Sequence, residues 1–181
     1  MSAERRLELV TGGMAITPEF EVIEEGNRLP YAVAILMHWQ ERCRLGLQGM
    51  TRDEFLMTMT SGEMLLLSMA GIEVGALMFS MIIPDEKAEA HIIRWGKMPR
   101  PEWQWLCGKA CAWLFERYPE MKRIEAWFPV TNNGAVRIAK AVGFRIIGVM
   151  PEGVKISPGN FEDLAICALK RDWLKIPSRE G

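Results

Sequence analysis

The sequence lacks an excess of charge of either sign. Its 22 Lys and Arg residues against 23 Asp and Glu residues leave a formal net charge of −1. A near-neutral chain exerts no general electrostatic attraction on nucleic acid or anionic lipid, so neither is expected as a partner. The chain also lacks an uncharged apolar run of the roughly 18 residues that a membrane span needs, and it begins without the apolar core of a signal peptide. We therefore expect a cytoplasmic protein.

Cysteine is scarce and poorly placed for a metal site. The four cysteines, Cys43, Cys107, Cys111 and Cys167, fall in expected helices or in a strand rather than in short loops at metal-ligand spacing. Cys107 and Cys111 share one face of a helix, but no further Cys-His cluster completes a site. We expect buried free thiols and no metal.

Internal repeats, low-complexity tracts and interdomain linkers are missing as well. The 181 residues are 49% hydrophobic and 25% charged. This length and composition suit one globular domain over residues 1–181 that buries a single core.

The most informative segment is TNNGAVRIAKAVGF, residues 131–144. Thr131 or Asn132 can cap a helix by accepting hydrogen bonds from free amides of its first turn. Gly143 suits the left-handed position that ends a helix, and Phe144 then opens a strand. The helix keeps one apolar face, formed by Ala135, Ala139 and Val142.

Periodicity gives the elements around this segment. Two helices are expected near residues 30–44 and 51–60, and Thr51 with Glu54 resembles a capping box at the start of the second. A longer helix is expected over 101–118, with its apolar residues as core. Strands are expected over 5–16, 63–70, 72–83, 88–95, 123–128 and 161–173, an irregular acidic stretch over 18–27, and a polar hairpin over 151–160.

This order predicts an α/β (α+β) fold, a mixed twisted sheet of about six to seven strands with helices on both faces. The strands over 63–70 and 72–83 are nearly all apolar, as strands covered on both faces must be. The helix over 101–118 joins the fourth and fifth strands, which therefore run parallel. A ligand is expected outside their carboxyl ends, where the free amides that begin this helix can bind a pyrophosphate.

The spacing of Asn132, Ala135 and Gly143-Phe144 resembles the last helix-to-strand passage of the GNAT acyl-CoA N-acetyltransferase superfamily. The Val74-Gly75 pair lies where that superfamily often has one. The closing strand resembles that of the ribosomal-protein N-terminal acetyltransferase branch, and its matching residues are Phe161, Asp163, Leu169 and Trp173. The resemblance covers roughly residues 60–175.

The resemblance implies a GNAT fold in which the fourth and fifth strands splay apart. It also implies acetyl-CoA as co-substrate and transfer of acetyl to an amine, on a small molecule or on a protein N-terminus. The cofactor-binding residues that it implies are Ile93, Trp95, Lys97, Arg100, Asn132 and Ala135. Asn132 has a second interpretation, because capping a helix is enough to explain an Asn there.

The loop after the fourth strand departs from the superfamily. Members normally carry Arg or Gln, two further residues, and then Gly-x-Gly or Gly-x-Ala. Residues 95–102 read WGKMPRPE, in which Gly96 is the only glycine, the two prolines donate no amide, and Glu102 adds negative charge. Lys97 and Arg100 could supply charge that the missing amides do not. An altered acyl-CoA site and a lost one both stay open.

Glu89 and His91 on the fourth strand are the candidate catalytic bases. They alternate with apolar residues and so share a face with Ile93 and Trp95. His91, with an ordinary pKa of about 6.5, could take a proton from the nucleophile. The alternative is a structural His beside a surface Glu. Ala139 stands where many GNAT enzymes carry a Tyr acid, so no Tyr acid is expected.

His38 lies on the apolar side of its expected helix and is interpreted as structural. Trp103, Trp105 and Trp127 could border an acyl or aromatic substrate, although packing explains most tryptophans in such a chain.

A second hypothesis follows from the unusual loop. By analogy with the GNAT-like proteins of phage genomes whose phosphate loops are eroded, the chain would then be an inactive GNAT-fold protein that binds protein subunits of a larger assembly such as a phage particle, with the virion as its location.

Overall fold

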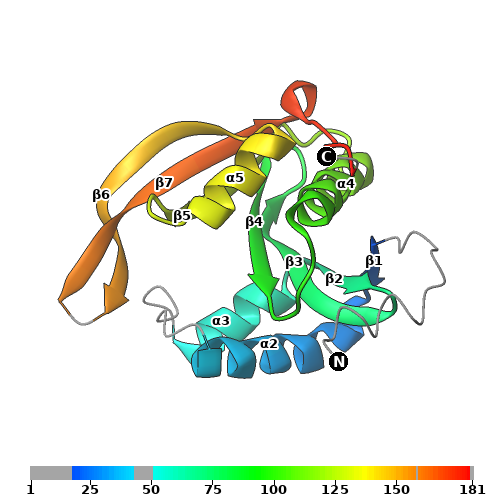
Figure 1. Ribbon diagram of the computed structural model, residues 1–181, viewed down its shortest axis with the longest axis horizontal. Coiled ribbons are helices and arrows are strands. Elements are labelled where there is room, and N and C mark those ends of the chain that lie inside the picture. The colour runs from blue at the N-terminus through cyan, green and yellow to red at the C-terminus, as the bar shows by residue number, and fades with distance from the viewer. Residues whose placement is uncertain (1–17, 43–50, 158, 180–181) are drawn as a thin grey trace, which may run out of the picture.

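The computed structural model describes residues 18–42, 51–157 and 159–179. Within them, seven strands form one mixed sheet in the order β1-β2-β3-β4-β5-β7-β6 (Figure 1). The expected strand over 5–16 and Cys43 lie outside the described residues. None of the helices in the described ranges is long and apolar enough to cross a membrane. The elements are β1 Pro18–Ile23, α2 Arg28–Arg42, α3 Arg52–Thr60, β2 Glu63–Met69, β3 Ile72–Ile83, β4 Lys87–Arg94, α4 Arg100–Arg117, β5 Arg123–Pro129, α5 Asn133–Val142, β6 Arg145–Ser157 and β7 Asn160–Lys170, with short 3-10 helices at Glu25–Asn27 and Arg171–Trp173.

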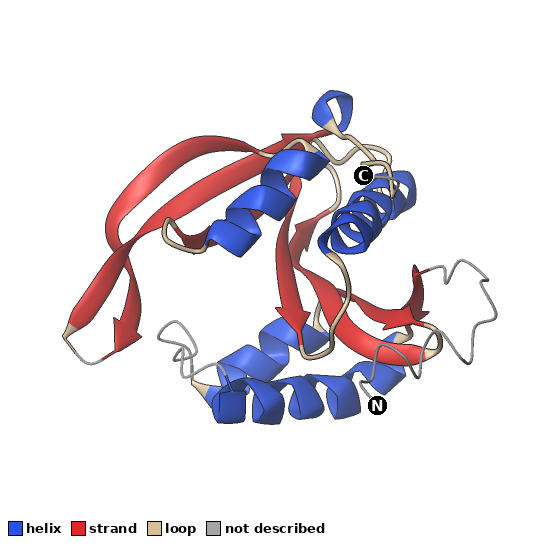
Figure 2. Ribbon diagram, viewed as in Figure 1, coloured by secondary structure: helices blue, strands red, loops and turns tan. Residues whose placement is uncertain are grey.

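Helices cover both faces of this sheet, as the sequence predicts (Figure 2). Successive residues of a strand point to opposite faces, so the mostly apolar strands β2 and β3 bury side chains on both faces of the sheet. One set packs against α4, and it consists of Leu65, Leu67, Leu77 and Phe79. The other set packs against α2 and α3, and it consists of Met64, Leu66, Ala76 and Met78.

The helix boundaries follow the expected local chemistry. Thr51 Oγ1 accepts from the Glu54 amide at 3.2 Å, and the Glu54 carboxylate accepts from the Thr51 amide at 2.7 Å, which confirms the capping box. Asn132 Oδ1 accepts from the Ala135 amide at 3.1 Å at the start of α5. Gly143 ends α5 in the left-handed conformation, with φ of 106°.

The expectation of an irregular acidic stretch over 18–27 was wrong for its first part. Residues 18–23 are a strand, because their backbone pairs antiparallel with the outer edge of β2 and buries Ile23. The expected hairpin over 151–160 is present, and the strands extend farther into it than expected, since β6 continues to Ser157 and pairs with β7 almost to the turn. A register shift between Met150 and Val154 accommodates the polar residues within the ladder.

The strands β4 and β5 are parallel but paired over only three residue pairs. These are Lys87 with Arg123, Ala88 with Ile124 and Glu89 with Glu125. Farther along, β4 stays paired with β3 and β5 stays paired with β7. The two strands are therefore held by their outer neighbours while their facing edges part, which confirms the predicted splay.

An ion-pair cluster, the Glu125 clamp, lies at the point where the strands are still joined. The Glu125 carboxylate accepts from Arg123 Nε at 2.7 Å and from Lys87 Nζ at 3.1 Å, and its side chain is 8% exposed. Arg123 also contacts Glu86 at 3.3 Å. Lys87 lies on β4 and Arg123 on β5, so one buried carboxylate ties the two strands together immediately before they separate.

We expect Glu125→Gln to lower the free energy of unfolding by about 3 kcal/mol at neutral pH, because partly buried Lys87 loses its counter-charge and Arg123 keeps only Glu86. Burial alone would raise the pKa of Glu125, but hydrogen bonds and charge from Arg123 and Lys87 outweigh it and lower the pKa below 4.5. This stabilisation is present above pH 4.5 and is lost as the pH falls through the lowered value.

Urea denaturation of the wild type and of Glu125→Gln between pH 3 and 8 measures the effect. The difference in the free energy of unfolding between the two proteins should become smaller as the pH falls. Glu120→Gln, at an exposed position, is the control and should change stability little. If this difference stays constant across the pH range, the charge of the Glu125 carboxylate does not stabilise the pairing of β4 and β5.

Candidate active site

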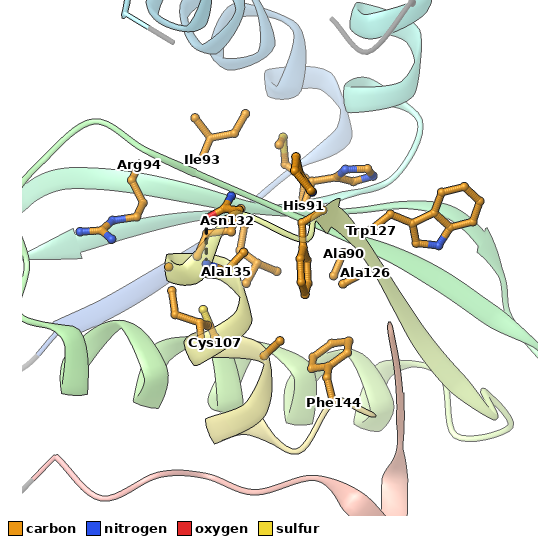
Figure 3. Close-up of a pocket in the computed structure, with 18 of the residues that line it drawn as sticks. Ala90, His91, Ile93, Arg94, Cys107, Ala126, Trp127, Asn132, Ala135 and Phe144 are labelled. Carbon is orange, nitrogen blue, oxygen red and sulfur yellow. Dashed lines mark hydrogen bonds between the residues drawn. The ribbon is translucent and has the colours of Figure 1, made fainter. Parts of the chain in front are cut away.

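A cavity of about 380 Å³ lies between the parted strands. Figure 3 shows that it passes through the sheet, with His91, Ile93 and Trp127 on the side of α2 and α3. Asn132, Ala135, Cys107 and Phe144 lie on the side of α4 and α5 (Figure 3). The backbone edges of residues 90–94 and 126–129 face this cavity without a partner strand, so their polar groups are available to a ligand.

The α4 side of the cavity is mostly apolar, and a cation lies on it. Arg94, the last residue of β4, has its guanidinium 4.7 Å from the ring centroid of Trp103. Burial raises the pKa of the Cys107 thiol to about 12, although the nearby Arg94 charge opposes this shift. Burial, and secondarily Cys107, raise the pKa of Cys111 well above its ordinary value. Both thiols are therefore protonated and act as apolar lining, as predicted.

The α2/α3 side holds both candidate bases. Glu89 lines a second cavity of about 240 Å³, which shares Ala90, His91, Trp127 and Val154 with the first. Burial raises the pKa of Glu89, the Lys87 charge opposes this, and the Glu125 charge adds to it. A carboxylate with a raised pKa is a stronger base than an ordinary one, which favours proton transfer from an amine.

His91 is a weaker base than its ordinary pKa suggests. Burial lowers its pKa from 6.5 to about 4, so the imidazole is neutral at physiological pH. Its Nε2 lies 2.8 Å from Oγ of Ser80, which is 1% exposed on the neighbouring strand β3. His91 thus borders both cavities as a neutral hydrogen-bonding group, held in place by Ser80.

The loop before α4 uses its glycine for packing. The amides of Trp95 and Gly96 both donate to the Val74 carbonyl, at 3.0 and 2.9 Å. A Cβ on Gly96 would lie 2.8 Å from the Val74 Cα, so no larger residue fits. Gly75 has a related role, since a Cβ there would lie 2.5 Å from the Trp103 ring. The Val74-Gly75 pair and Gly96 therefore bring β3, the loop and α4 into close contact.

Four amides near this helix start remain available to an anion. Among the described residues, the N–H groups of Lys97, Met98, Arg100 and Glu102 have no hydrogen-bond acceptor. Lys97 and Arg100 are exposed beside them. Glu102 in the first turn of α4 opposes an anion through its negative charge, and its Oε2 is buried without a hydrogen-bond partner in the described structure.

The residues proposed from the sequence fall into two groups. Ile93, Asn132 and Ala135 line the first cavity together with His91, and Glu89 lines the second. Three others do not line either cavity. Lys97 and Arg100 lie at the start of α4, outside both cavities. Trp95 packs against the cluster that contains Ile93, and it donates its indole N–H to the Glu73 carbonyl at 3.1 Å.

Other groups at the site were not proposed from the sequence. Arg94 alternates with Ile93 and so faces α4, a position that the strand period alone could have indicated. Ser80 could not be found this way, because its contact with His91 depends on the register of β3 against β4. Lys155 enters the cavity only because β6 extends past its expected end.

No protein-family model matches the chain, and no curated protein matches it in sequence. Solved structures do match in shape. The ribosomal-protein-S5-alanine acetyltransferase of Vibrio fischeri is 12% identical with a TM-score of 0.67, over 90% of this chain and 98% of that one. Spermidine N-acetyltransferase from Vibrio cholerae, solved with CoA and spermine, is 16% identical with a TM-score of 0.67, over 87% and 97%. A GNAT-family acetyltransferase from Streptococcus pneumoniae is 19% identical with a TM-score of 0.61, over 84% and 99%.

These likenesses establish the fold. The chain has the GNAT fold, with its parallel β4 and β5 parted around a cavity. Ribosomal-protein acetyltransferases are among the structures that share it, in agreement with the resemblance of the closing strand.

The lowered pKa of His91 predicts an NMR titration. The imidazole resonances should titrate with a midpoint near pH 4, because burial disfavours the charged ring. The unfolded chain binds this proton near pH 6.5 and the folded chain only near pH 4, so stability should fall as the pH drops between these values. His91→Gln should lack this titrating resonance. A midpoint near 6.5 would show that the ring is solvated.

Proposed function

We propose that the protein is an acetyl-CoA-dependent N-acetyltransferase that acts on an amine. The observation that supports this most is the cavity between β4 and β5, which crosses the sheet and has a basic carboxylate beside its α2/α3 opening. A thioester arm can enter from one face and an amine from the other. Structures of this fold include one solved with CoA and a polyamine.

The α4 side suits the donor. The free amides at the start of α4, together with Lys97 and Arg100, would hold the diphosphate, and Arg94 adds a cation at the cavity wall. The prolines and Glu102 make this cradle poorer in amides and less positive than a two-glycine loop. We therefore expect acetyl-CoA to bind, with side-chain charge supplying a larger share of the affinity.

The chemistry needs little from side chains. The amine nitrogen attacks the thioester carbonyl carbon, whose oxygen accepts hydrogen bonds from backbone amides on the open strand edges. The Glu89 carboxylate takes the proton that the amine loses, directly or through water, while neutral His91 hydrogen-bonds beside it. Collapse of the adduct breaks the carbon–sulfur bond and releases the thiolate.

No hydroxyl side chain lines either cavity in the part of the chain that the structure describes. Ala139 lies in the cavity wall where a Tyr acid would be expected. A thiol has a pKa of about 8.5, so the thiolate can leave near neutral pH and take its proton from water.

The first test is binding. Calorimetric titration of acetyl-CoA into the wild type should give a measurable Kd, and Lys97→Ala and Arg100→Ala should each weaken it by about fivefold, because each removes a charge near the diphosphate. Lys122→Ala, an exposed lysine at the opposite end of β5, is the matched control. Absence of binding at millimolar acetyl-CoA would reject the proposal and favour the inactive, assembly-binding alternative.

The second test is turnover, measured as thiol release with a panel of amines. Glu89→Gln should lower kcat by about 100-fold with little change in the Kd of acetyl-CoA, because it removes the base and keeps the shape. Glu120→Gln should match the wild type. Equal turnover of Glu89→Gln and wild type would remove Glu89 from the mechanism.

A further inference from the structure

The cavity wall on the α2/α3 side indicates what kind of amine can enter. Glu89 and His91 share one face of β4 by strand alternation, and Figure 3 shows His91 on the side of α2 and α3, whereas α4, with the free amides at its start, packs on the opposite face. A donor held at α4 therefore leaves the α2/α3 face to the acceptor. The acceptor must place its nitrogen near Glu89 and its remaining atoms against the surrounding wall.

That wall is apolar and buried. In the first cavity it consists of Phe55, Met59 and Met78, which are 1%, 3% and 1% exposed. In the second cavity it consists of Val154 and Leu164, which are 5% and 6% exposed. A substrate body placed here loses its contact with water, so an apolar body gains by binding and a charged one loses.

The charged residues that line the two cavities also favour a substrate with an uncharged body. Glu89 is the only carboxylate that lines either cavity among the described residues, and the other charged lining groups are the cations Arg94 and Lys155. Glu125, the nearest further acid along the sheet, already accepts from Lys87 and Arg123. Arg94 faces α4 on the donor side, so a second ammonium on the acceptor side would find no further carboxylate among the described lining residues.

Trp127 provides the remaining surface. Its side chain lies on the same side of the sheet as His91, it borders both cavities, and it is 42% exposed (Figure 3). An exposed indole at a cavity mouth offers a flat apolar surface to an alkyl or aromatic group.

We infer that the acceptor is a primary monoamine with an uncharged, apolar body that packs against Trp127. This inference rests on the proposed acetyltransferase activity and deepens it. It separates this chain from the spermidine N-acetyltransferase of the same fold, whose named substrate carries several amino groups.

The test uses two amines that differ in one group, hexylamine and 1,6-diaminohexane. Both present the same primary amine on the same chain, but only the diamine carries a second ammonium. Acetylation followed by mass spectrometry should give a kcat/KM at least about tenfold higher for hexylamine, which corresponds to about 1.4 kcal/mol. Spermidine should be as poor as the diamine.

Variants at Trp127 link this preference to the proposed surface. Trp127→Glu should reduce the hexylamine-to-diamine ratio by about tenfold, because it places a carboxylate where the second ammonium would lie. Trp127→Phe keeps an aromatic surface and should keep the ratio. Circular dichroism of both variants checks that they fold, which is expected because the side chain is partly exposed.

The outcomes separate the two proposals. A diamine acetylated as well as hexylamine, or a ratio that Trp127→Glu leaves unchanged, overturns the inference while the acetyltransferase activity stands. Acetyl-CoA binding without acetylation of any amine rejects the activity. In that case NMR titration of both amines into the acetyl-CoA-loaded wild type still decides the inference, since shifts at Trp127 that favour hexylamine support it and equal or absent shifts overturn it.

Discussion

The molecule depends on where the pairing of β4 and β5 stops. Three residue pairs and the Glu125 clamp hold the strands together, and from the next residue onward each strand hydrogen-bonds only to its outer neighbour. A fully paired sheet would leave no passage between the faces. Because the clamp is buried and bridges both strands, it fixes the joined end, and the cavity begins one residue beyond it.

Glycine in the loop before α4 has a different structural role in this chain than in the superfamily pattern. In the superfamily pattern, glycines bring amides close to a diphosphate. In this chain Gly96 is required by its contact with Val74, and its amide is already hydrogen-bonded there. The positive charge at the helix start therefore comes from Lys97 and Arg100, and under the proposed function this would make acetyl-CoA affinity more sensitive to salt than a cradle of amides would.

Local chemistry made much of the fold predictable. The capping box at Thr51, the cap at Asn132 and the left-handed Gly143 each act within a few residues, and each is found as expected. The apolar strands β2 and β3 were also predictable, since burial on both faces leaves a direct compositional mark. The strand at residues 18–23 was not, because its acidic residues suit a loop and only the open edge of β2 makes it a strand.

The candidate site was likewise predictable from the sequence only in part. Sequence by itself determined the elements, their order and the face of β4 that carries Glu89 and His91, because helix caps and strand alternation are encoded in neighbouring residues. Only the tertiary structure decided that His91 is neutral and bonded to Ser80, that Trp95 packs away from the cavity, and that Trp127 and Glu89 border one space. These properties depend on strand register and burial, which arise from contacts between residues far apart in the chain.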